Sequence, residues 1–122
     1  MGAVTVSVVA LASVDQIELP GGSWSRMLVT QERVGGTASS LGCSVFKPGS
    51  ATTSVAHEVE EVAYVVTGSG RLDTNDGEVR FCGGDALHIP SGTWHAVVND
   101  SDSDVVMVFG FPHPDYPPTE RR

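Results

Sequence analysis

Residues 84–99 read GDALHIPSGTWHAVVN, and residues 49–68 read GSATTSVAHEVEEVAYVVTG. In both stretches, short apolar and β-branched runs lie between glycines and prolines. Val, Thr and Tyr favour pleated strands, whereas Gly and Pro mark turns. The two stretches therefore predict short strands joined by tight turns. They also hold three side chains of the kinds that bind metals, His57, Glu61 and His95.

The remainder of the chain continues this pattern. Residues 4–9, 26–30 and 41–46 read as strands, and Asn75-Asp76-Gly77 predicts a type I′ hairpin turn. No stretch shows a helical stripe, and the prolines of residues 111–118 argue against regular structure in the tail at 111–122. Roughly ten short strands with frequent turns predict an all-β fold, a small antiparallel β-barrel or jelly roll.

Length and charge limit the classes of function. The 122 residues suffice for one domain, 1–122, with its core motifs at 49–99. A formal net charge of -8 with only 7 Lys and Arg argues against nucleic acid and anionic membranes as partners. Cys43 and Cys82 do not make a disulfide framework and read as buried, reduced thiols. The apolar run at residues 4–12 has no Lys or Arg before it and is too short to cross a bilayer, so we expect a first strand in a cytoplasmic protein.

The spacing of the histidines and the glutamate suggests a shared site. Along an unbroken strand, residues of equal parity face one side, which aligns Val55, His57 and Glu61. His95 opens a strand after the Pro90 turn, and the intervening hairpins bring it across the barrel. Two imidazoles and a carboxylate suit Fe(II), Mn, Ni, Cu or Zn, and they leave coordination positions open for a substrate or O₂.

The two stretches resemble the two motifs of the cupin family. The second motif is matched at every fixed position, by Gly84, Pro90, Gly92, His95 and Asn99. The first motif is matched at four fixed positions, namely Gly49, His57, Glu61 and Gly68. The fifteen residues between the motifs resemble the spacer of the smallest members. The resemblance implies a jelly-roll barrel with metal ligands at His57, Glu61 and His95.

One position departs from the family pattern. The first histidine of the first motif falls at residue 55, which is Val55 here. Three family ligands therefore carry over instead of four. The vacated position either makes room for a bidentate substrate or weakens metal retention.

Further candidates surround the proposed ligands. His88 is the candidate for catalytic acid, base or replacement ligand, with a strand histidine on the other side of the sheet as the alternative. Val55, Phe46 and Tyr64 are candidate substrate-binding walls, although Phe46 and Tyr64 also suit a barrel core. Glu58 and Glu60 have the opposite parity to Glu61 and are expected to face solvent.

The resemblance leaves three functions open. The favoured one is a dioxygenase-like oxidoreductase that uses Fe(II) and O₂ on a small organic molecule. The second keeps a divalent metal as a Lewis acid for isomerase, cyclase or lyase chemistry. The third is a barrel that binds a small molecule without catalysis. A homodimer is expected, with the N-terminal strand at its interface.

Overall fold

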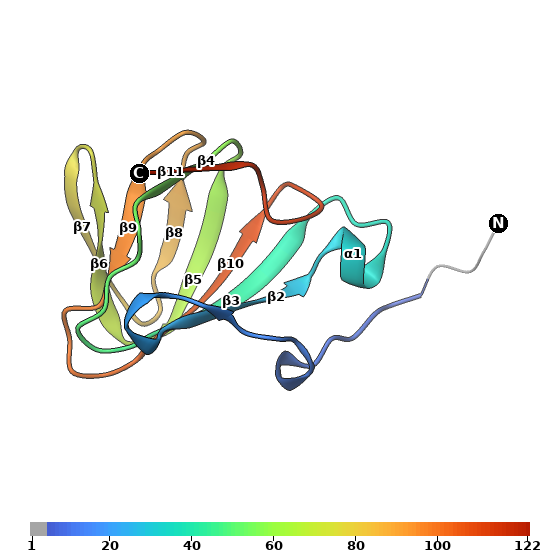
Figure 1. Ribbon diagram of the computed structural model, residues 1–122, viewed down its shortest axis with the longest axis horizontal. Helices are drawn as coiled ribbons and strands as arrows, with labels where there is room; N and C mark the ends of the chain where they lie inside the picture. Colours follow the sequence, from blue (N-terminus) through green and yellow to red (C-terminus); the bar gives the residue numbers. More distant parts are fainter. Residues whose placement is uncertain (1–4) are drawn as a thin grey trace.

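Two antiparallel sheets enclose the interior in the computed structural model, which describes residues 5–122 (Figure 1). The larger sheet has the order β1-β2-β3-β10-β5-β8, and its strands are β1 (Ile17–Glu18), β2 (Trp24–Val29), β3 (Ser40–Phe46), β10 (Val105–Phe111), β5 (Glu61–Thr67) and β8 (Ala86–Ile89). The smaller sheet has the order β11-β4-β9-β6-β7, and its strands are β11 (Thr119–Arg121), β4 (Val55–His57), β9 (His95–Val98), β6 (Ser69–Thr74) and β7 (Gly77–Cys82). This architecture confirms the predicted all-β jelly roll.

Helical structure is short. Two single 3₁₀ turns, η1 (Leu11–Ser13) and η2 (Pro20–Gly22), precede β2, and α1 (Gln31–Val34) connects β2 to β3. Thr30 caps α1 by accepting a hydrogen bond from the Arg33 amide. Within residues 5–122, no helix is long and apolar enough to cross a membrane.

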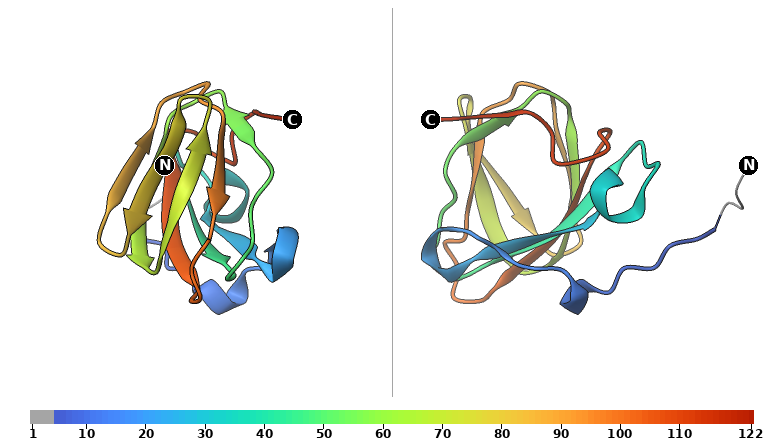
Figure 2. Two further views of the ribbon diagram at one scale, coloured as in Figure 1. Left: turned by 90° about the vertical axis from the view of Figure 1, so that its left-hand side faces the viewer. Right: turned by 45° about the vertical axis from the view of Figure 1, so that its right-hand side comes forward.

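Both ends of the chain differ from the prediction. Val4 lies outside the described residues, and residues 5–10 form no strand and run away from the barrel in Figure 2. They have no neighbouring strand to bond with, and Val6 and Val8 are more than nine-tenths exposed. At the other end, residues 119–121 form β11, which pairs antiparallel with β4. The prolines stop before this segment, so its amide donors remain available.

The β6–β7 hairpin is present, but its turn is not type I′. Thr74 pairs with Gly77, and Gly77 has a φ of 113°. Among the described residues, only glycines have positive φ, so Asn75 and Asp76 cannot form the mirror-image turn. Thr74 Oγ1 instead accepts from the Asp76 amide at 3.1 Å and donates to the Gly77 carbonyl at 2.8 Å, which holds the turn.

The core lies between the sheets. Its members come from both, and they include Phe46, Ala63, Val65, Leu72, Phe81, Ile89, Val105, Met107, Phe109 and Phe111. On β5 the alternation is regular, because Glu61, Ala63 and Val65 are buried while Val62 and Tyr64 are exposed. Burying one face of β5 in this way fixes which of its side chains reach the interior.

Two motif residues have structural roles. Gly68 has a φ of 92°, and a Cβ there would lie 2.4 Å from the Asp104 carbonyl oxygen, so only glycine fits the turn. Asn99 is fully buried, and its amide nitrogen donates to the carbonyl oxygens of Phe46 and Ser103, each at 2.8 Å. Asn99 therefore ties the loop after β9 to the end of β3.

Candidate metal centre

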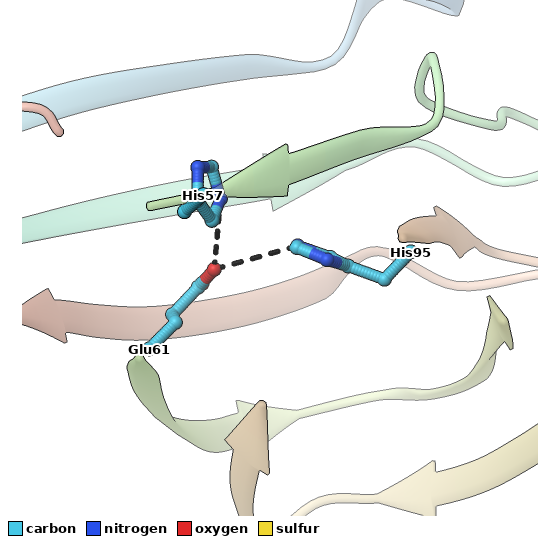
Figure 3. Close-up of side chains that lie close together, drawn as sticks. All are labelled: His57, Glu61 and His95. Carbon is cyan, nitrogen blue, oxygen red and sulfur yellow. Dashed lines mark ion pairs between the residues drawn. The ribbon is translucent and has the colours of Figure 1, made fainter. Parts of the chain in front are cut away.

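His57, Glu61 and His95 meet in the interior (Figure 3). His57 ends β4 and His95 begins β9, both in the smaller sheet, whereas Glu61 begins β5 in the larger sheet. The prediction of one unbroken strand from His57 to Glu61 is therefore wrong. A bend at residues 58–60 carries the chain from one sheet to the other, so the two side chains approach across the interior instead of along one strand.

The geometry of the three groups fits a metal ion. Glu61 Oε1 lies 3.2 Å from His57 Nε2 and 3.4 Å from His95 Nε2. Ligand atoms bound at about 2.1 Å to one ion are separated by roughly 3.0–3.4 Å in octahedral or tetrahedral geometry. All three residues are less than a tenth exposed. Both distances between the carboxylate oxygen and a ring nitrogen therefore match those between ligands of one divalent ion, and the three ligand atoms all lie within 4.8 Å of one another.

Hydrogen bonds on the far side of each ring set its tautomer. His95 Nδ1 lies 2.9 Å from the Thr93 carbonyl oxygen, which can only accept, so Nδ1 carries the proton. His57 Nδ1 lies 2.7 Å from Thr119 Oγ1, whose own proton goes to the Pro117 carbonyl at 2.8 Å, so His57 Nδ1 is also the donor. In the neutral rings both Nε2 lone pairs then point at Glu61, which is the arrangement of metal-binding histidines.

Burial and hydrogen bonding oppose each other at this cluster. Burial would raise the pKa of Glu61, but the hydrogen bonds that the His57 and His95 rings donate when they also carry a proton on Nε2 outweigh it and bring the pKa below its ordinary value. Burial would lower the pKa of His95, but the Glu61 carboxylate and the Thr93 carbonyl outweigh it and raise that pKa. The cluster therefore favours positive charge beside the ionised carboxylate, as a proton or as a cation.

A cavity of about 310 Å³ opens beside Glu61 and His95. Its walls are mainly apolar, and they include Phe46, Val55, Leu72, Ile89, Val97, Met107, Phe109 and Phe111. Polar lining comes from Ser25, Ser44, Thr52 and Thr53, and charged lining from Glu18 and Arg121 beside Glu61. An apolar body with a few converging polar groups is typical of sites for small organic molecules.

His57 does not line this cavity. Its ring is 5% exposed and packs edge-on against Phe111 and Tyr116, with ring centroids 4.9 and 5.5 Å away. The two aromatic rings and Thr119 therefore fix the orientation of His57, while Glu61 and His95 face the cavity.

Two predicted wall residues line the cavity and two other candidates do not. Val55 and Phe46 line it, and their contact with a substrate stays a prediction. The predictions that placed Tyr64 and His88 at the cavity are wrong, because both side chains face outward. Tyr64 alternates with the buried Ala63 and Val65, and His88 pairs with the exposed Val62. The His88 side chain is 59% exposed and lies 3.1 Å from Glu60, which excludes it from the cavity as acid, base or ligand.

The other sequence expectations near the site have mixed outcomes. Glu58 and Glu60 are exposed, as their parity predicted. Cys43 and Cys82 are both free, and Cys43 is buried, but Cys82 is exposed on the outer strand β7.

The C-terminal tail supplies three site residues that sequence reasoning missed. Thr119 bonds His57, Tyr116 packs on His57 and lines the cavity, and Arg121 lines the cavity from β11. Burial raises the pKa of Tyr116 above its ordinary value, although Thr119 and Arg121 partly oppose the shift, so its hydroxyl keeps the proton at neutral pH. The prolines of the tail argued against regular structure there, and no local sequence pattern indicates β11.

Comparisons with known proteins identify the family. The family described as Cupin domain matches residues 43–111. The tetracenomycin polyketide synthase protein TcmJ of Streptomyces glaucescens is 31% identical over 102 residues, which are 83% of this chain and 68% of that protein.

Solved structures share the fold. The polyketide cyclase RemF of Streptomyces resistomycificus is 24% identical with a TM-score of 0.80, over 96% of this chain and 85% of RemF. A predicted oxalate decarboxylase of Thermotoga maritima is 23% identical with a TM-score of 0.72, over 86% of this chain and 97% of that one. These identities support likeness of fold alone.

Proposed function

The chain belongs to the cupin domain family, and from this premise we propose that it is a metal-dependent cyclase of polyketide-type substrates, acting without net oxidation. The observation that carries the proposal is the buried cluster of His57, Glu61 and His95 beside an apolar cavity. The names of TcmJ, a polyketide synthase protein, and RemF, a polyketide cyclase, support the substrate class.

In this proposal His57, Glu61 and His95 hold a divalent transition metal. When bound there, such an ion supplies Lewis acidity that polarises a substrate carbonyl. The chain's own contribution begins with the tautomers that Thr119 and Thr93 impose, because they keep both Nε2 atoms free for coordination. Val55 leaves space next to His95, its direct neighbour across the β4–β9 pair, for a substrate oxygen.

The cavity walls orient the substrate. Phe46, Phe109 and Phe111 offer apolar and aromatic surfaces that exclude water and accept a planar, folded chain. A chain held in a curved form brings its nucleophilic carbon close to the carbonyl it attacks, which turns cyclisation into a favourable intramolecular step. The Tyr116 hydroxyl keeps its proton and can donate a hydrogen bond to a substrate oxygen at the cavity.

An intramolecular aldol condensation balances without an oxidant. The enol carbon forms a bond to the carbonyl carbon, the enol O–H bond breaks, and its proton passes to the carbonyl oxygen, which becomes a hydroxyl. That hydroxyl then leaves as water with a hydrogen from the attacking carbon, and a C=C bond forms in their place. The ligand set also favours a second candidate, since two histidines and one carboxylate with open positions are typical of Fe(II) oxygenases. In that candidate O₂ is consumed, so the two functions differ in a measurable reactant.

Metal content and product analysis test the proposal. We expect close to one divalent metal per chain by elemental analysis, lost in His57→Ala and His95→Ala and retained in His88→Ala, a matched control on the outer face. A linear poly-β-ketone should then yield a cyclised product lighter by one water, with no O₂ uptake.

Other results would contradict the proposal. O₂ uptake with an oxygenated product would favour the oxygenase. Binding without turnover would favour a non-catalytic barrel. If the chain bound no metal after reconstitution, both the metal-dependent cyclase and the Fe(II) oxygenase would be excluded.

A further inference from the structure

Val55 lies between two other cavity-lining residues in the smaller sheet. The β4–β11 pair places Arg121 directly opposite Val55, and the β4–β9 pair places His95 on its other side. Residues directly opposite in an antiparallel pair point to the same face. All three side chains line the cavity. Arg121 thus lines the cavity next to Val55, whose other neighbour is a proposed metal ligand.

Arg121 is available to bind an anion. It is the one Lys or Arg among the lining residues of the cavity, in a chain of net charge -8. Within residues 5–122, the ion pairs formed by arginines involve Arg71 and Arg80 and leave Arg121 unpaired. The neighbouring Arg122 is used elsewhere, since it lies over the Trp94 ring at 4.2 Å and bonds Asn75.

Charge balance at the cavity also favours an anion. Its charged lining is Glu18, Glu61 and Arg121. With a divalent ion at the proposed centre, these groups sum to a charge of about +1, which attracts a negatively charged ligand despite the acidic surface. A planar guanidinium presents paired N–H donors that match the two oxygens of a carboxylate.

We propose that Arg121 is a specificity-determining residue that binds a carboxylate on the substrate, next to the coordination position that Val55 leaves open. This inference rests on the proposed function, and it narrows the substrate class to aromatic or polyketide-type carboxylic acids. The carboxylate is held at the β4–β11 edge, and the apolar body extends between the aromatic walls.

Binding of two matched probes tests this role. The probes are 1-hydroxy-2-naphthoate and its neutral amide, 1-hydroxy-2-naphthamide, titrated calorimetrically into the full chain with and without one equivalent of Zn²⁺. We expect wild type to prefer the carboxylate. In Arg121→Gln we expect that preference to fall by about tenfold or more, because a charge-assisted hydrogen bond is lost. Arg121→Lys should restore part of it, since it restores the charge but not the paired donors.

A matched control and a separate readout keep the result interpretable. Arg122→Gln removes the adjacent charge outside the cavity and should leave the preference unchanged. Equal affinity of Arg121→Gln and wild type for the carboxylate would overturn the inference, as would no preference in wild type. Zinc binding in the same titrations reports on the proposed centre independently. A chain that binds no zinc but shows the Arg121-dependent preference refutes the proposed function and supports this inference.

Discussion

His57 Nδ1 lies 2.7 Å from Thr119 Oγ1, so a hydroxyl from the last strand sets the tautomer of a proposed metal ligand. Removing that hydroxyl in Thr119→Val should weaken metal affinity by about 10–100-fold, because loss of an outer-shell partner of a ligating histidine has effects of this size. Competition with a chromophoric chelator measures the change. Thr119→Ser keeps the hydroxyl and should behave like wild type, whereas equal loss in both variants would point to a packing role for the residue.

Val55 occupies the position at which the family motif has its first histidine. It faces the cavity directly opposite His95. Val55→His should therefore add a fourth ligand and raise metal affinity by about tenfold or more, while it fills the open position and lowers substrate affinity. The absorption spectrum of the Co(II)-loaded protein reports the change in coordination.

Val79→His, on the exposed face of β7, is the control for that experiment. A Co(II) spectrum of Val55→His identical to that of wild type would mean that residue 55 is too far from the ion to coordinate it.

The sequence predicted the clustering of the candidate ligands better than it predicted their surroundings. His57, Glu61 and His95 were found because two motifs with fixed spacings contain them. The reason first given for the alignment of His57 and Glu61 failed, because parity holds only within a strand and the chain changes sheets between them. Parity within β5, however, already separates the outward Tyr64 from the inward Ala63 and Val65.

The tail could not be predicted from local signals. Thr119, Tyr116 and Arg121 follow or lie among prolines, which argue against a strand. Residues 119–121 become a strand because β4 offers an unpaired edge, and that edge exists only once the barrel has formed. Contacts of this kind, between residues about sixty positions apart, depend on tertiary structure and leave no pattern in a short window.

An ion-pair cluster beside the end of β9 predicts a response to acid. Asp100 accepts from Arg80 at 2.8 and 2.9 Å and from Arg71 at 3.1 Å, and these arginines lower its pKa to about 2. A lowered pKa means that the ion pairs stabilise the fold above the ordinary pKa of 3.8 and that this contribution is lost as the pH falls toward 2.

The substitution Asp100→Asn tests this directly. We expect its urea midpoint to lie below that of wild type at about pH 7, and the gap between the two proteins to narrow at about pH 2–3. Asp76→Asn, in the exposed hairpin turn, is the control for loss of one surface charge. A gap that stays constant with pH would show that Asp100 acts through packing or loop geometry instead of charge.

The outer face of the larger sheet carries an apolar row of Val62, Tyr64 and Val66, all about half exposed. The segment at residues 5–10 adds Val6 and Val8, which are more than nine-tenths exposed on a stretch without a strand partner. Pairing of two copies is a common way in which soluble proteins cover exposed apolar surface. We therefore propose a homodimer that uses this face and the N-terminal segment.

Light scattering after size exclusion should give twice the chain mass of 12.8 kDa. Tyr64→Glu places a charge in the row and should shift the protein to monomer, because a buried unpaired charge is costly. Val79→Glu makes the same change on β7 in the other sheet and should leave the dimer intact. A wild-type protein that elutes with the mass of one chain at micromolar concentration would refute the dimer, and a shift in both variants would place the interface elsewhere.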